Sequence, residues 1–344
     1  MLDATPRSEA PVLVEVHRGE MVESKHRVSI AVSNVKGEML VAEGDIFAPV
    51  YPRSAIKPLQ ALAMMESGAV GKFGLTAKEI SLACASHNAE PDHIATVEAW
   101  LEKIGCGKED FECGPHFPFR EPQLVAFVKA GITPERIHNN CSGKHTGFLS
   151  AAKAMGCDTK GYIKYGHPIQ QSVLGILEQM TGLDLAQFPR GTDGCGIPTI
   201  AIPLGNMALA FARMADPSDQ PDRRQTACAS VMKSMAAEPF MVAGTGRFCS
   251  DVMQVVGDRA IMKTGAEGVY CATLIEQELG VAIKAEDGNG RAAEVALGQI
   301  LKYFDILTAA EEDALSQSLS PVVFNAEGDR TGQIRFVEGH RLSR

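Results

Sequence analysis

Residues 26–44 read HRVSIAVSNVKGEMLVAEG, and this stretch decides the fold. Apolar and polar side chains alternate on both sides of a break at Asn34–Gly37, which predicts a β-hairpin. The preceding segment, VLVEVHRG at 12–19, alternates in the same way. We therefore expect the N-terminal part of the chain to supply strands of an antiparallel sheet.

The C-terminal part of the chain repeats this pattern. Two short strands are expected within PVVFNAEGDRTGQIRFVEG at 321–339, around the turn at Glu327–Asp329. A further strand cluster is expected at 258–288, followed by a helix at 290–304. Strands at both ends around a helical middle predict an α+β fold of the three-layer α/β/α kind, with an antiparallel sheet formed from both chain ends and the late strand cluster.

The middle of the chain has the period of helices. Helical stretches closed by Gly or Pro are expected at 90–105, 143–156, 167–182 and 221–239. No repeat, low-complexity segment or linker divides the chain. We therefore expect a single catalytic domain over 1–344, with a helical subregion at about 70–250 packed on the sheet.

Composition narrows the function classes. The chain has 344 residues, 45% of them apolar, and a formal net charge of -9, so no basic stripe is available for nucleic acid or an anionic membrane. No run of about 18 apolar residues is present, and the first thirty residues lack the layout of a signal peptide. Nine cysteines without an export signal predict reduced thiols and a cytoplasmic protein.

Ser54 and Lys57 form an S-x-x-K pair in YPRSAIKPLQAL, at the start of an apolar run with helical spacing. The pair alone is weak evidence for a catalytic site, because S-x-x-K occurs four times in the chain. A serine at this position can simply cap the helix. It can also be a nucleophile, if Lys57 lies on the same face and is neutral enough to take its proton.

Two further motifs favour the nucleophile. Ser86-His87-Asn88 follows an apolar helix, and Lys263-Thr264-Gly265 ends an expected strand. S-x-x-K, S-x-N and K-T-G in this order form the set with which penicillin-recognising serine hydrolases build an acyl-transfer site. The short separation of Ser54 and Ser86 indicates a relative of the β-lactamases and not a member.

Two glycine-rich turns carry possible metal ligands. HNNCSGKHTGF at 138–148 holds Cys141, Lys144 and His145, and GTDGCGIPT at 191–199 holds Asp193 and Cys195. Thiolates from two loops suit Zn²⁺, with His145, Asp193 or Lys144 as possible further ligands. A P-loop is excluded because His138 and His145 stand where its pattern requires glycine and Ser/Thr. The alternative is two buried thiols that steady the turns.

Six motifs in order carry a family resemblance: SAIKPLQ, ASHNAEPDH, HNNCSGKHTGFL, GTDGCGIPT, VAGTGRF and KTGAEG. Together they resemble the thermolabile asparaginase II family, the Rhizobium etli type of L-asparaginase. The resemblance implies an L-asparagine amidohydrolase, a homodimer, and a fold similar to serine β-lactamases and glutaminases.

The resemblance also implies roles for named residues. It implies a Ser54-Lys57 tandem and a Ser86-Lys263 tandem in one cleft, with Ser54 favoured as the nucleophile. Zinc would be held by Cys141, Lys144 and Cys195, with water in the fourth position. Arg53 and Asp193 would bind the α-carboxylate and α-ammonium of asparagine, and His145 and Asn88 are further candidates for substrate binding.

The sequence thus predicts an L-asparaginase that works through an acyl-serine intermediate with a zinc site near the cleft. A glutaminase or a penicillin-recognising hydrolase would use the same chemistry and is the first alternative. A non-catalytic zinc or amino-acid binding protein is the second, and the presence of both Ser-Lys pairs speaks against it.

Overall fold

A computed structural model of the chain describes residues 9–343. The chain divides into two compact units. The first is made of residues up to Ala55, Ile202–Asp216, and residues from Val255 onward. The second is made of Ile56–Ala201 and Pro217–Gln254. The single-domain boundary of 1–344 stays a prediction, since compactness of the units does not tell how they fold.

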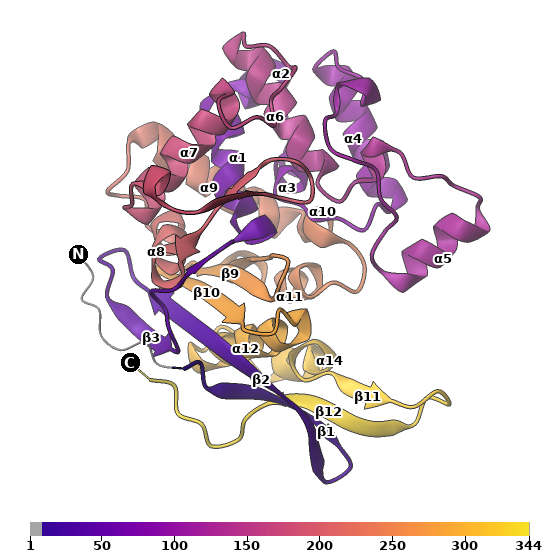
Figure 1. Cartoon of the computed structure of the whole chain (residues 1–344), viewed down its shortest axis with the longest axis vertical. Helices are drawn as coiled ribbons and strands as arrows, with labels where there is room; N and C mark the ends of the chain where they lie inside the picture. The colour runs from indigo at the N-terminus through magenta and orange to yellow at the C-terminus, as the bar shows by residue number, and fades with distance from the viewer. Residues whose placement is uncertain (1–8, 344) are drawn as a thin grey trace. The chain divides into compact units, whose positions relative to one another are not determined.

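The first unit is built on an eight-stranded antiparallel sheet. In Figure 1 its N-terminal strands are indigo, β9 and β10 are orange, and the C-terminal strands are yellow. The order is β11-β12-β1-β2-β10-β9-β8, and β3 also pairs with β2. The strands are β1 (Val12–Arg18), β2 (Met21–Ser33), β3 (Met39–Glu43), β8 (Ala260–Thr264), β9 (Val269–Leu274), β10 (Leu279–Ala285), β11 (Val322–Phe324) and β12 (Arg330–Phe336). Both chain ends and the late strand cluster therefore form one sheet, which confirms the predicted α+β fold.

The hairpin at 26–44 forms where the sequence predicts it. The side-chain Oδ1 of Asn34 accepts the backbone N–H groups of Lys36 and Glu38 at 3.0 and 3.1 Å, and Gly37 adopts φ +79°. Asn and Gly favour such a turn because the amide side chain bonds nearby backbone and glycine tolerates positive φ. The turn fixes the register of β3 on β2, and the other edge of β2 pairs with β10.

Helices α8 (Leu204–Ala215) and α12 (Gly290–Tyr303) pack on opposite sides of β9 and β10 (Figure 1). All six residues of β9 are buried, so both faces of the sheet are covered there. Gly280 lets α8 approach closely, because a Cβ at this position would lie 1.9 Å from the carbonyl oxygen of Ala208. The unit is completed by α13 (Ala309–Ala314), α14 (Ser316–Leu319), and the pair β4 (Pro49–Val50) with β7 (Ile202–Pro203).

The second unit is mainly helical. It contains α1 (Lys57–Glu66), α2 (Ala69–Phe73), α3 (Ala77–Ala83), α4 (Pro91–Lys103), α5 (Glu121–Lys129), α6 (Ser142–Met155), α7 (Pro168–Thr181), α9 (Asp222–Ala237), α10 (Pro239–Ala243), most of α11 (Phe248–Val256), and the pair β5 (Arg190–Thr192) with β6 (Pro198–Ile200). The helices expected at 90–105, 143–156, 167–182 and 221–239 are confirmed as α4, α6, α7 and α9.

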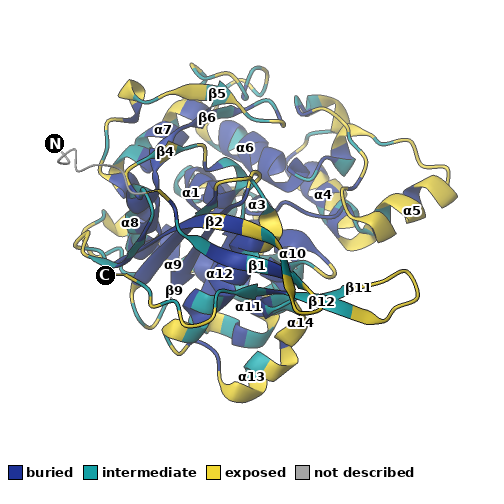
Figure 2. Ribbon diagram, turned by 60° about the horizontal axis from the view of Figure 1, so that its bottom comes forward, coloured by how far each residue is buried: buried dark blue, intermediate teal, exposed yellow. Residues whose placement is uncertain are grey.

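Helix α6 is the centre of this unit. It packs against α1, α3, α4 and α7, and its first eleven residues are all buried, as the dark blue ribbon in Figure 2 shows. Gly143 makes the packing possible, since a Cβ there would lie 2.3 Å from the carbonyl oxygen of Leu82. The start of α6 therefore lies against the end of α3, close to the segment that carries Ser86. Within residues 9–343, no helix combines the length and apolarity needed to cross a bilayer.

Candidate active site

Ser54 lies in the short 3-10 turn Arg53–Ile56, directly before α1. Pro58 occupies the first turn of α1, where its missing N–H costs nothing, and the regular helix begins at Lys57, after Ser54. Arg53 adopts φ +50°, an uncommon conformation for a residue with a side chain. Backbone strain of this kind is concentrated at functional sites, and here it directly precedes the predicted nucleophile.

The K-T-G motif reaches the same turn within the first unit. Strand β8 ends at Thr264, and a Cβ on the following Gly265 would lie 2.6 Å from the carbonyl oxygen of Pro52 and 3.1 Å from the backbone nitrogen of Ala55. Only glycine permits this approach. Lys263 is fully buried, and its Nζ donates to the carbonyl oxygen of Thr264 at 2.7 Å. The first unit therefore places the end of β8 against the turn that holds Ser54.

Lys57 opens α1 in the second unit and is only 1% exposed. Its Nζ donates to Ser86 Oγ at 3.0 Å, to Cys141 Sγ at 3.1 Å, and to the carbonyl oxygen of Ala85. Burial lowers the pKa of Lys57, and the charge of Lys144 lowers it further against the opposing influence of Cys141. A buried lysine with a lowered pKa, hydrogen-bonded to a serine hydroxyl, can accept a proton from it.

Cys141, Lys144 and Cys195 form a buried cluster beside Lys57. Cys141 is the N-cap residue of α6, Lys144 lies in its first turn, and Cys195 lies in the β5–β6 turn. Lys144 Nζ donates to Cys195 Sγ at 2.9 Å. A hydrogen bond from Cys141, together with Lys144, lowers the pKa of Cys195 well below its ordinary value, whereas the same sulfur contact and burial raise the pKa of Cys141 to about 12. The cluster thus places Cys195 Sγ in contact with both Lys144 and Cys141.

These three residues fit the zinc ion that the family resemblance implies. The pKa of Cys195 is lowered by the hydrogen bond from Cys141 and by Lys144, and Lys144 Nζ lies 2.9 Å from Cys195 Sγ; the two sulfurs raise the pKa of Lys144 against the effect of burial. Thiolates and nitrogen are donors that Zn²⁺ accepts, and Lys144 would have to bind as the neutral amine. Across residues 9–343, no three His, Cys, Asp or Glu side chains are grouped so that they could hold a metal, so such a site depends on Lys144.

Two buried histidines flank the cluster in α6 and after α3. His145 Nδ1 lies 2.7 Å from the hydroxyl of Tyr162, and burial with the charge of Lys144 lowers the pKa of His145 well below its ordinary value. Its Nε2 is buried without a hydrogen-bond partner in the part of the chain that the structure describes. His87 Nε2 lies 2.9 Å from Ser142 Oγ, and burial lowers its pKa as well. Both imidazoles are therefore neutral hydrogen-bonding groups.

The predicted substrate-binding residues differ in their surroundings. Asp193 is partly exposed in the β5–β6 turn, accepts the N–H of Gly194 at 2.7 Å, and contributes negative charge at Lys144. Arg53 is partly exposed in the first unit. Asn88 is 2% exposed, and its side-chain hydrogen bonds connect it to neighbouring protein groups. The roles of all these residues stay predictions.

The second unit thus brings Lys57, Ser86, Cys141, Lys144 and Cys195 together, and the first unit brings Ser54 near the end of the strand that carries Lys263. Sequence reasoning missed the groups that support Ser86. Arg247 donates a hydrogen bond to the carbonyl oxygen of Ser86, and Thr245 donates two hydrogen bonds to the carboxylate of Glu90, which follows the Ser86–Asn88 segment. The sequence motif that contains Thr245 and Arg247 is VAGTGRF at 242–248. Its glycines indicate a turn, but they do not indicate which distant segment the turn contacts.

The L-asparaginase II family model matches residues 14–336. The chain belongs to the L-asparaginase II family. This match covers all the motif-bearing residues of the chain, and with them every catalytic and zinc-binding residue predicted from the sequence. No curated protein matched this asparaginase-family chain.

Several solved structures resemble this L-asparaginase II family member at low identity. Mglu in its native form in 4.3 M NaCl is 14% identical, with 84% of this chain and 63% of Mglu covered at a TM-score of 0.45. The D-alanine carboxypeptidase AmpC of Burkholderia cenocepacia is 12% identical, with 76% and 88% covered at 0.36. A β-lactamase of Mycobacterium bovis is 11% identical, with 85% and 95% covered at 0.33. The chain thus spans less than two thirds of Mglu, and at these TM-scores the assignment rests on the family model alone.

Proposed function

We propose that the protein is an L-asparaginase, which hydrolyses L-asparagine to L-aspartate and ammonia. The observation that carries the proposal is the family match over residues 14–336, taken with the buried hydrogen bond between Lys57 Nζ and Ser86 Oγ. The hydrogen bond supports the part of the proposal in which Lys57, kept from solvent, exchanges a proton with Ser86 as a relay group.

In the proposed mechanism, neutral Lys57 takes the proton of Ser54, and Ser54 Oγ attacks the side-chain amide carbon of asparagine. The C–N bond breaks, and the proton taken up by Lys57 passes by way of Ser86 and Lys263 to the leaving nitrogen, which departs as ammonia. Water then attacks the aspartyl ester, releases aspartate, and returns the proton to Ser54. A positive charge on Lys263 would also favour the neutral form of Lys57 by repulsion.

The substrate would be held by its charged ends. Arg53 suits the α-carboxylate because a guanidinium binds carboxylates through two parallel hydrogen bonds, and Asp193 suits the α-ammonium. His145 and Asn88 are assigned to the same task as neutral hydrogen-bonding groups.

Zinc is part of the proposal. Cys141, Lys144 and Cys195 would hold the ion, with water as the fourth ligand, and the ion would join the two loops and help to orient the substrate. Cys195 would supply a thiolate to this set, because the hydrogen bond from Cys141 and the charge of Lys144 lower its pKa.

Two assays with purified protein test the substrate assignment. One measures ammonia release from L-asparagine and from L-glutamine, and the other measures ring opening of the β-lactam nitrocefin. The proposal predicts ammonia from asparagine at a kcat/KM at least about tenfold above that for glutamine. Turnover of glutamine or nitrocefin in preference to asparagine would replace the substrate assignment. Binding of asparagine without turnover of any compound would identify a non-catalytic binding protein.

We also propose that the enzyme is a homodimer, as the family resemblance implies. Helix α5 is exposed along most of its length, as its yellow colour in Figure 2 shows. The exposed apolar side chains on it and beside it are Phe117, Phe119, Leu124, Val125, Val128 and Ile132. Apolar patches of more than a few hundred Å² mark interaction surfaces. Antiparallel pairing of two α5 helices would cover this patch and set Glu121 at the start of one helix near the oppositely charged Lys129 at the end of the other.

Sedimentation velocity of Val128→Glu tests this dimer. The variant is expected to sediment as a monomer, while Phe324→Glu, which changes a similarly exposed apolar residue on β11, is expected to remain dimeric. A wild-type monomer, or an unchanged dimer in Val128→Glu, would refute the α5 interface. None of the nine cysteines, all of which lie within residues 9–343, forms a disulfide, which suits a reducing compartment, and we propose the cytoplasm.

A further inference from the structure

The segment Val242–Arg247 docks on the segment that carries Ser86. The Ser86 N–H donates to the carbonyl oxygen of Val242 at 2.9 Å, and the Asn88 N–H donates to that of Ala243 at 3.0 Å. These two segments are more than 150 residues apart in sequence but belong to the same unit. The main chain of Ser86 is therefore held from one side by a short, ladder-like contact.

Gly244 fixes how closely the two segments approach. Its backbone lies at φ +105° and ψ -171°, a conformation open essentially only to glycine. A Cβ at this position would lie 2.2 Å from Glu90 Oε1 and 3.0 Å from both Asn88 Nδ2 and His93 Cε1. The turn is thus pressed against the Asn88–His93 segment with no room for a side chain.

Glu90 locks the two segments together. Its carboxylate accepts the N–H of Thr245 at 2.8 Å, the hydroxyl of Thr245 at 2.7 Å, and Nδ2 of Asn88 at 3.1 Å. Asn88 Nδ2 also donates to the carbonyl oxygen of Thr245 at 3.2 Å. Burial works to raise the pKa of Glu90, but these hydrogen bonds outweigh it and the pKa is lowered, so the group is a carboxylate.

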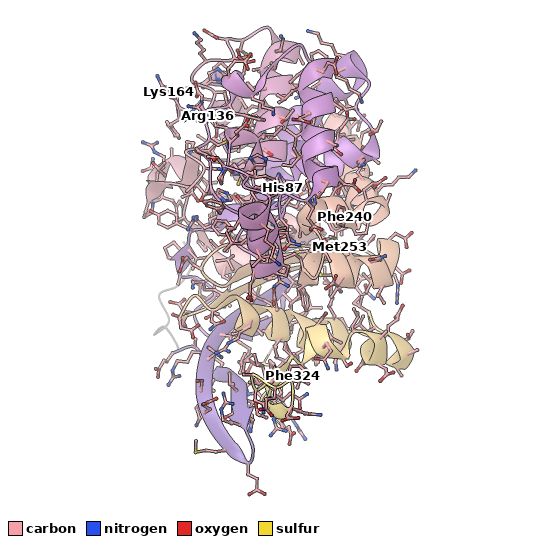
Figure 3. All side chains as sticks on the ribbon, turned by 90° about the vertical axis from the view of Figure 1, so that its right-hand side faces the viewer. His87, Arg136, Lys164, Phe240, Met253 and Phe324 are labelled. Atoms are coloured by element: carbon pink, nitrogen blue, oxygen red, sulfur yellow. The ribbon has the colours of Figure 1, made fainter. Side chains whose placement is uncertain are left out.

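A stack of three rings also joins the two segments. The rings of His87 and His93 lie 5.0 Å apart and those of His93 and Phe240 lie 4.6 Å apart, both nearly parallel. Figure 3 labels His87 and Phe240, which lie near one another. The stack joins α10, which leads into Gly244, to the segment after Ser86. It leaves the Ser86 backbone little freedom on this side.

Arg247 completes the arrangement. Its Nη1 donates to the carbonyl oxygen of Ser86 at 3.3 Å and to Oδ1 of Asn88 at 3.0 Å. The N–H and C=O of Ser86 are then both bonded to Val242–Arg247, while its Oγ receives the hydrogen bond from Lys57 at 3.0 Å. Moving the Ser86 backbone would break the contact between Ser86 Oγ and Lys57.

We propose that Arg247 is a positioning residue that holds the Ser86 peptide so that Ser86 Oγ stays within hydrogen-bond distance of Lys57 Nζ. It acts through Ser86 and Asn88 and makes no contact with the reacting atoms. The inference rests on the proposed function for its effect on turnover, because only an enzyme that uses Ser86 would lose rate when this peptide moves.

Arg247→Gln and Arg247→Ala test the inference, with Arg224→Gln as the matched control. Arg224 is a buried arginine of the same unit, whereas Arg247 is partly exposed, and Arg224 pairs with Glu66 on α1 instead of with the Ser86 segment. A misplaced proton-relay group is expected to lower kcat by about ten- to a hundredfold while KM stays within about threefold. Added guanidinium is expected to restore part of the kcat of Arg247→Ala but none in Arg224→Gln.

Amide hydrogen exchange of the substrate-free protein gives a readout that needs no activity. The N–H groups of Ser86 and Asn88 are expected to exchange faster in both Arg247 variants and at the wild-type rate in Arg224→Gln. Thr245→Val removes only the hydroxyl bond to Glu90 and should raise the exchange rates of these two amides by a smaller factor. If the Arg247 variants do not fold, this variant tests whether the Val242–Arg247 segment holds the Ser86 peptide.

Unchanged kcat, a rise of KM alone, or unchanged exchange at Ser86 and Asn88 would each overturn the positioning role. A rise of KM alone would mean that the guanidinium binds the substrate. If the wild-type protein releases no ammonia from asparagine, the proposed function fails. The exchange of these two amides would still decide whether Arg247 holds the Ser86 peptide.

Discussion

Replacing Lys57 with methionine separates the chemical role of this lysine from its part in the fold. Methionine keeps most of the length of the side chain but cannot accept a proton or donate a hydrogen bond. Lys57 is 1% exposed and donates to Ser86 Oγ, Cys141 Sγ and the carbonyl oxygen of Ala85. The substitution removes all three bonds and places an apolar group at the same position.

The two effects differ in size. Loss of a general base lowers the rate by about 10²–10⁴-fold, which corresponds to about 3–5 kcal/mol of transition-state stabilisation at 1.36 kcal/mol per factor of ten. Three lost hydrogen bonds cost about 1 kcal/mol each in stability. Burial of the apolar methionine offsets about 1–2 kcal/mol of this. Lys57→Met should therefore remain folded with a free energy of unfolding about 1–2 kcal/mol below wild type, while turnover nearly disappears.

Steady-state ammonia release and urea unfolding of the same preparations measure the two effects. Lys153→Met is the control, because Lys153 belongs to another S-x-x-K pair, lies in α6, and donates to the carbonyl oxygen of Gly105 on the surface. It should keep turnover within about twofold of wild type. A Lys57→Met variant with more than about a tenth of wild-type kcat would refute Lys57 as the base.

Three further predictions concern the metal and the fold. Cys195→Ala should reduce zinc per chain, measured by plasma mass spectrometry, to below about a tenth of the wild-type content, and a zinc-free wild-type protein would refute the metal site. Gly280→Ala should destabilise the protein by about 1–3 kcal/mol or more in urea unfolding, because its Cβ would meet the α8 backbone, whereas Gly290→Ala has open space and should change little. The hydrogen bond from Arg259 lowers the pKa of Glu311 from 4.5 to about 2, so this carboxylate stabilises the fold above pH 4.5 and ceases to do so as the pH falls toward 2. Glu311→Gln should accordingly lower Tm at pH 7 and leave it unchanged near pH 2.

Local patterns in the sequence predict the strands well. The alternation at 26–44 and the turn at Asn34–Gly37 depend only on neighbouring residues, and β2 and β3 form there. The same is true of α4, α6, α7 and α9. The sequence analysis does not predict helix α8, of which eight of the twelve residues are buried.

Long-range contacts are the part that local patterns do not give. The sulfur cluster depends on Cys141 and Cys195 meeting across 54 positions of sequence, and the metal hypothesis anticipated this from the residue types and the family resemblance. The contact between Arg247 and Ser86 was not anticipated, since the glycines around Arg247 show a turn but not the segment on which it packs. The sequence therefore predicts candidate site residues from their motifs, whereas the contact of Arg247 with Ser86 is seen only in the structure.

Trapping the acyl-enzyme tests the central claim most directly. Protein mixed with L-asparagine would be quenched in acid after milliseconds, digested, and analysed by mass spectrometry for an aspartyl ester. The account predicts the ester on the peptide that contains Ser54, its loss in Ser54→Ala, and its disappearance once asparagine is consumed. Steady ammonia release by Ser54→Ala, or an ester on Ser86 with none on Ser54, would contradict it.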